Sequence, residues 1–95
     1  MTLCVVTATT NYDRAKACID SWGDVPKVIV HNGTVHITAV EQSVQDGTAV
    51  HALTQSDYLG TVPAFRAGVD YALDHTTADI LVCLHDDVQI LDPEW

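Results

Sequence analysis

Ninety-five residues are enough for one small domain, and 47% hydrophobic against 18% charged residues indicates a folded core rather than a disordered chain. The 13 Asp and Glu residues outnumber the 4 Lys and Arg residues, which gives a formal net charge of -9. This balance argues against nucleic acid and anionic membrane surfaces as partners, because both need a basic face.

The chain contains no apolar run near the roughly 20 residues that a membrane-spanning helix needs. Leu3 to Val6 is too short for the apolar part of a secretory signal, and no basic region precedes it. Cys4, Cys18 and Cys83 lack the spacing of a metal or redox motif, so we interpret them as reduced core residues. These features predict a cytoplasmic protein without a membrane span.

A strand and a helix are predicted at the start of the chain. Leu3 to Ala8 is an apolar, β-branched run typical of a strand. Thr10 or Asn11 can cap a helix from about Tyr12 to Trp22, and Gly23 is placed to end it. The apolar residues of this helix fall at i, i+3, i+4 and i+7, which predicts one buried stripe. The stripe consists of Ala15, Cys18, Ile19 and Trp22.

The middle of the chain predicts further strands. Pro26 to His31 is a second apolar run, and Asn32-Gly33 after it is a turn signal. Val35 to Val40 alternates loosely and fits either a hairpin return or a short extra strand. Gln42 to Gly47 is polar and predicts a loop, and Ala49 to Leu53 predicts a short third strand.

The last third predicts a second helix and a final strand. The helix starts at about Pro63, and its stripe consists of Phe65, Gly68, Val69, Ala72 and Leu73. Asp79 to Leu84 is the final strand, and its apolar part from Ile80 onward predicts burial on both faces of a sheet. Strands separated by helices of this length indicate an α/β fold, with a mainly parallel sheet flanked by helices.

Two adjacent carboxylates, Asp86 and Asp87, follow the final strand directly. In open α/β sheets, ligands bind in the crevice outside the carboxyl ends of the strands. Adjacent carboxylates repel each other, and Mg²⁺ typically binds one or two carboxylates together with phosphate oxygens. The pair therefore fits a metal–phosphate site, or alternatively a solvated acidic turn.

Four segments that carry these elements occur in a characteristic order. They are Val5–Arg14 with Ser21-Trp22 behind it, Val28–Thr34, Ala64–Ala72, and Leu84–Val88 with Asp92–Trp95 behind it. Together they resemble the N-terminal, donor-binding half of a family 2 glycosyltransferase, a nucleotide-diphospho-sugar transferase with the GT-A fold. The matching features are the first strand and helix, the Asp-Asn-Gly-Ser type turn, the helix before the metal motif, and the Asp-x-Asp region.

The resemblance implies a Rossmann-like GT-A nucleotide-binding half, with residues 1–95 forming a single nucleotide-sugar-binding domain that stops before the acceptor-binding half. The implied function is the donor-binding part of a metal-dependent glycosyltransferase. Such an enzyme moves a sugar from a nucleoside diphosphate sugar to an acceptor, here unknown, with Mg²⁺ or Mn²⁺. The general base is expected beyond Trp95, so residues 1–95 should bind a donor without transferring sugar. An open sheet edge would also favour a homo-oligomer.

The resemblance also assigns roles to the acidic segment. It assigns metal binding to Asp87, the last residue of the Asp-x-Asp triplet, and donor contact to Asp86. His85 takes the first position of the triplet, where it could be a nitrogen ligand or a hydrogen-bonding residue at the strand end. This chain further departs from the family at His31, where Asp is frequent, and at Arg66, near a common Asn.

A nucleotide base would need polar groups at the ends of the first two strands. Ala8 and Thr9 offer backbone groups there, and the amide of Asn32 presents both a donor and an acceptor. We therefore predict that these three residues contact the nucleotide.

Positive charge for a diphosphate could come from the two arginines, Arg14 and Arg66. The alternative makes Arg14 a helix-face residue and Arg66 a surface partner of Asp70, its i+4 neighbour. Trp22 and Phe65 both fall on apolar stripes, so we interpret them as core residues rather than sugar-stacking platforms.

Two other function classes fit less of the sequence. A non-catalytic α/β module could bind a nucleotide or a protein partner through the same sheet edge. A phosphoacceptor receiver domain would need an acidic pair after the first strand, whereas Leu3 to Ala8 is followed by Thr9-Thr10.

Overall fold

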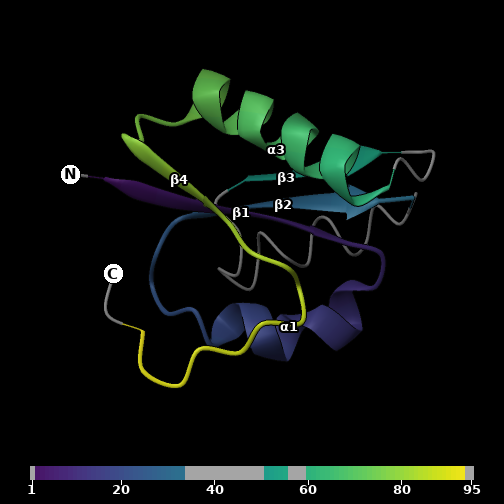
Figure 1. Cartoon of the computed structure of the whole chain (residues 1–95), viewed down its shortest axis with the longest axis vertical. Helices are drawn as coiled ribbons and strands as arrows, with labels where there is room; N and C mark the ends of the chain where they lie inside the picture. Colours follow the sequence, from purple (N-terminus) through teal and green to yellow (C-terminus); the bar gives the residue numbers. More distant parts are fainter. Residues whose placement is uncertain (1, 34–50, 56–59, 94–95) are drawn as a thin grey trace.

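The computed structural model describes residues 2–33, 51–55 and 60–93. Along the chain, the described elements are β1 (Leu3–Thr9), α1 (Tyr12–Asp20), β2 (Lys27–Asn32), β3 (His51–Gln55), α3 (Thr61–His75) and β4 (Ile80–Cys83). All strand pairs among them are parallel, in the sheet order β3-β2-β1-β4 (Figure 1). The predicted α/β class, with a parallel sheet flanked by helices, is confirmed.

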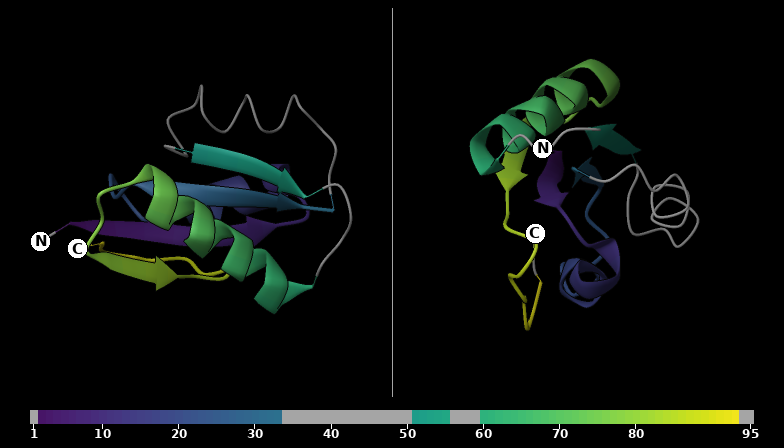
Figure 2. Two further views of the ribbon diagram at one scale, coloured as in Figure 1. Left: turned by 90° about the horizontal axis from the view of Figure 1, so that it is seen from above. Right: turned by 90° about the vertical axis from the view of Figure 1, so that its right-hand side faces the viewer.

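Helices α1 and α3 cover opposite faces of the sheet (Figures 1 and 2). Successive side chains of a strand point to opposite faces. On β1, Val5 packs in the cluster of α1 with Ile19 and Trp22, whereas Cys4 and Val6 pack in the cluster of α3 with Ala72. The central strands β1 and β2 are therefore covered on both sides, and every residue of β2 is buried.

Helix α1 starts where the sequence predicts and ends earlier. The side chain of Asn11 caps it by accepting a hydrogen bond from the Arg14 backbone N–H at 3.2 Å. The helix ends at Asp20 rather than Trp22, and Gly23 follows with a φ of +83°, which disfavours other residues. Trp22 is nevertheless fully buried, so its predicted core role is confirmed outside the helix.

Helix α3 begins at Thr61, two residues before the predicted start at Pro63. Its buried residues are Ala64, Gly68 and Ala72, which are spaced by four along one line of the helix. Because these small residues make the closest approach to the sheet, larger residues beside the line remain only partly covered. The prediction that Leu73 belongs to the buried stripe is wrong, since its side chain is 63% exposed.

Strand β4 corrects the prediction that the run from Ile80 to Leu84 is buried on both faces. Ile80 and Cys83 are exposed, and the residues between them are half-buried. Among the described strands, β4 lies at the edge of the sheet and pairs only with β1. An apolar run indicates a strand but not its position in the sheet, and an edge strand is covered less than a central one.

The cysteines are also less buried than the sequence predicts. All three are free thiols, but only Cys4 is buried, whereas Cys18 is half-buried and Cys83 is exposed. The prediction that Cys83 is a core residue is therefore wrong, for the same reason as for β4.

Other element boundaries differ by one or two residues. β2 runs one residue later than the predicted Pro26 to His31, and β3 runs two residues later than the predicted Ala49 to Leu53. The predictions for Val35 to Val40 and Gln42 to Gly47 lie outside the described residues. Within the part of the chain that is described, no helix combines the length and apolar character needed to cross a membrane.

We expect Thr7→Val to stabilise the fold by about 1–2 kcal/mol, because an unpaired buried hydroxyl carries a desolvation cost that valine removes. Thr7 is fully buried, and its Oγ1 has no hydrogen-bond partner among the described residues. The matched control is Thr9→Val, because Thr9 Oγ1 accepts a hydrogen bond from the Asn11 N–H at 3.1 Å and its loss should destabilise. Urea unfolding measures both changes. A less stable Thr7→Val protein would show that the hydroxyl has a partner, such as a buried water.

Candidate functional site

A pocket of about 120 Å³ opens at the carboxyl ends of β1 and β2. Its residues come from β1 and the turn after it (Ala8, Thr9, Thr10), β2 (Asn32), the start of α3 (Thr61, Phe65) and the segment after β4 (His85, Asp86). In the sheet order, β1 lies between β2 and the later strand β4. Open α/β sheets bind ligands at the carboxyl edge where the strand order reverses in this way.

The pocket brings together five residues that are predicted from the sequence to contact a ligand or metal. They are Ala8, Thr9, Asn32, His85 and Asp86. They come from three separate parts of the chain and meet because parallel strands place their carboxyl ends at one edge.

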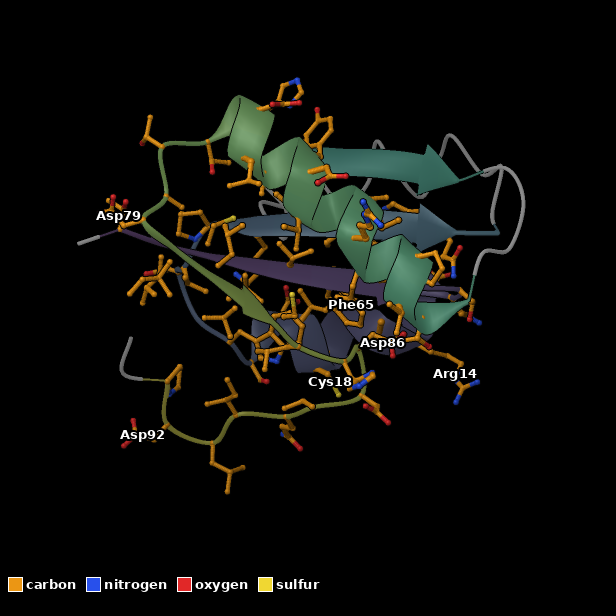
Figure 3. All side chains as sticks on the ribbon, turned by 45° about the horizontal axis from the view of Figure 1, so that its top comes forward. Arg14, Cys18, Phe65, Asp79, Asp86 and Asp92 are labelled. Atoms are coloured by element: carbon orange, nitrogen blue, oxygen red, sulfur yellow. The ribbon has the colours of Figure 1, made fainter. Side chains whose placement is uncertain are left out.

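Three other candidates do not line the pocket. Asp87 is exposed in the turn after β4, and Arg66 is exposed on α3. Arg14 is exposed on α1, and its side chain points away from the molecule (Figure 3). Arg66 forms no ion pair with Asp70, so the alternative surface role suggested for it by their spacing is not seen among the described residues.

Backbone hydrogen bonds bring the acidic turn to the end of β1. The Leu84 N–H donates to the Val6 carbonyl at 3.0 Å, which continues the pairing of β1 and β4 beyond Cys83. The Val88 N–H donates to the His85 carbonyl at 3.3 Å and closes a turn. His85 and Asp86 are thereby held beside Thr9 and Ala8, with Asp86 half-buried and His85 exposed.

Phe65 and His85 form an aromatic pair at the pocket. Their ring centroids lie 5.6 Å apart at an interplanar angle of 88°, a favourable edge-to-face geometry. Figure 3 shows Phe65 and Asp86 at the same end of the molecule. Phe65 also packs against the buried cluster beside α3. It is therefore partly a core residue, as predicted, and partly a pocket residue.

Sequence reasoning missed Thr10, Thr61 and Phe65 as pocket residues. Thr10 belongs to the polar break after β1, where the sequence indicates only a possible helix cap. Thr61 and Phe65 depend on where α3 begins, and the positive φ of Gly60 (+84°) sets that start before Pro63. The signal available in the sequence was Gly60 itself, because glycine is favoured where φ is positive.

His31 lies next to Asn32 in β2 and is fully buried on the α1 side, where its ring centroid is 5.7 Å from that of Tyr12. Burial lowers the pKa of the His31 imidazole from its ordinary value of 6.5, because a charged ring loses hydration there.

We expect the free energy of unfolding to fall as the pH drops below 6.5, because the unfolded chain then protonates His31 while the folded protein resists protonation. Above this pH both states are neutral and the contribution of His31 to stability is complete. Urea unfolding at about pH 7.5 and 5.5 tests this, with His31→Asn and the exposed His75→Asn as a matched pair. If His31→Asn keeps the full pH dependence, the effect arises elsewhere.

The described residues contain no group of three or more His, Cys, Asp or Glu side chains that could hold a metal ion. A cation at the turn after β4 would therefore need oxygens from water or from a bound ligand. Mg²⁺ commonly binds in this way, with one or two carboxylates and substrate phosphates.

Comparisons of the chain with family models, curated proteins and solved structures found no match. What the pocket can bind follows from its lining residues and its position on the sheet.

Proposed function

We propose that the chain is the donor-binding part of a metal-dependent glycosyltransferase, which moves a sugar from a nucleoside diphosphate sugar to an acceptor. The observation that supports this is the pocket at the carboxyl edge, where Ala8, Thr9, Asn32 and Asp86 meet. The strand order β3-β2-β1-β4 agrees with the first four strands of the common dinucleotide-binding order, in which nucleotides bind at this edge. The proposed half is accordingly Rossmann-like, of the GT-A type.

The size of the pocket favours a single ring. Its volume of about 120 Å³ is close to that of a cavity of about 150 Å³ that accepts benzene. Asn32 is buried at the pocket wall, and its amide carries both a donor and an acceptor, as a base edge does. A base would therefore enter the pocket, while the phosphates and sugar would lie outside it.

The phosphates need positive charge that the pocket itself does not supply. No Lys or Arg is among the described residues that line it. The N-terminus of α3 borders the pocket through Thr61, and its N-cap residue Gly60 has no side chain to bond the first N–H groups, so this end favours an anion. A divalent cation bound by Asp87 would supply the remaining charge, and when bound it would act as a Lewis acid on the departing diphosphate.

We expect UDP to bind more tightly with Mn²⁺ than without it, and uridine to bind equally in both conditions. The base is uncharged and does not need the cation, whereas the phosphates do. Calorimetric titration of the wild-type protein with uridine and UDP, each with and without Mn²⁺, gives the four affinities. The proposal fails if neither compound binds at millimolar concentration.

A second candidate is a non-catalytic α/β module that binds a nucleotide. The observation that favours it is the exposed position of Asp87 outside the pocket, which leaves Asp86 as the lining carboxylate. This candidate predicts that UDP and uridine bind with similar affinity and that Mn²⁺ changes neither.

A further inference from the structure

The segment from Leu84 to Pro93 contains no helix or strand, yet it lies along α1 and is tied to the end of that helix (Figure 1). The Trp22 indole Nε1–H donates to the Val88 carbonyl at 2.8 Å. The Ile90 N–H donates to Ser21 Oγ at 3.0 Å. Two hydrogen bonds therefore join the end of α1 to this irregular segment, one at Val88 and one at Ile90.

Apolar packing adds to these hydrogen bonds. Leu84 and Ile90 pack against the buried cluster that contains Ile19 and Trp22. At the far end of the segment, a Cβ on Gly23 would lie 3.2 Å from Pro93 Cγ, so proline sits close against this glycine. The whole segment follows the surface made by α1 and the turn after it.

The acidic turn is consequently fixed at both ends. On one side, the Leu84 N–H is bonded to the Val6 carbonyl of β1. On the other, the Val88 carbonyl is bonded to the fully buried Trp22. His85, Asp86 and Asp87 lie between these two anchors and are the side chains proposed to meet the cation and the donor.

We propose that Trp22 is a positioning residue for the turn from His85 to Val88, and that it controls cation binding there without contributing to the base pocket. This role rests on the proposed function, because it concerns the same cation. Trp22 touches neither ligand nor cation; its indole N–H holds the carbonyl of Val88, the residue after Asp87. When that hydrogen bond is lost, the turn samples more conformations, and a cation must order the turn before its carboxylates can bind it.

The decisive variant is Trp22→Phe, which keeps an aromatic ring in the cluster and removes the N–H donor. Its control is Ile19→Val, a change in the same buried cluster that leaves the Val88 hydrogen bond intact. Both variants lower stability through packing, but only Trp22→Phe releases the turn. The exchange rates of the backbone amides from 85 to 88 report that release directly.

We expect Trp22→Phe to weaken Mn²⁺ binding by about three- to tenfold, the range for one lost hydrogen bond. Paramagnetic broadening of the amide resonances of Asp86 and Asp87 by Mn²⁺ alone measures this affinity, and calorimetry measures uridine binding. Uridine affinity should be unchanged in both variants, and Ile19→Val should leave Mn²⁺ affinity unchanged. Wild-type Mn²⁺ affinity in Trp22→Phe would overturn the positioning role alone. Absence of Mn²⁺ binding in the wild-type protein would overturn the cation site of the proposed function and this role with it.

Discussion

Gly68→Ala is expected to destabilise the fold by about 2 kcal/mol, although alanine is the better helix former. A Cβ at position 68 would lie 2.5 Å from Val6 Cγ1 and 2.9 Å from Val30 Cγ2, closer than real contacts allow. Both valines belong to central strands and are fully buried, so neither can move aside. Overpacking of this kind costs about 1–3 kcal/mol, and the severe overlap favours the upper end. The better helix propensity of alanine offsets only about 1 kcal/mol of this cost.

Urea unfolding of Gly68→Ala measures the loss, and Asp70→Ala on the exposed side of α3 serves as the control for helix propensity. A double variant with Val6→Ala removes the nearest clashing methyl group, so its total cost should be smaller than the sum of the two single costs. A Gly68→Ala protein as stable as the wild type would mean that α3 can move away from the sheet at no cost.

The helices and central strands could be predicted because their signals are local. The Asn11 cap, the stripe that contains Ala15 and Ile19, and the apolar run of β1 each lie within one short stretch of sequence. Burial of β4 and Leu73 could not be predicted in this way. It depends on which strand lies at the edge of the sheet and on how closely Gly68 brings α3 to its partners, and both are properties of the assembled fold.

The pocket could be predicted only in part, again because some of its geometry depends on the assembled fold. Thr9, Asn32 and Asp86 each follow or end a strand, and the rule for parallel sheets is enough to place them at one edge. The rule does not tell which of two adjacent residues in a turn faces inward. Asp86 lines the pocket and Asp87 is exposed, a difference set by the local path of the chain after Leu84.

The two carboxylates of the turn should therefore respond differently to substitution. We expect Asp87→Ala to remove the gain in UDP affinity that Mn²⁺ provides, a loss of at least about tenfold, because it deletes the proposed oxygen ligand of the cation. Asp86→Ala should weaken UDP binding with or without Mn²⁺, because this half-buried carboxylate borders the pocket itself. Calorimetric titration with UDP in both conditions separates the two effects.

Asp92→Ala is the matched control for both variants. Asp92 is exposed on the same segment, beyond the anchors at Val88 and Ile90 (Figure 3). Its replacement removes the same charge from a chain of net charge -9 without touching the turn. An equal loss in Asp92→Ala and Asp87→Ala would show that Mn²⁺ only screens the acidic surface. If Asp86→Ala alone removed the Mn²⁺ effect, the cation would lie at the pocket wall, on the carboxylate that the fold already holds in place, and Asp87 would be a solvated turn residue.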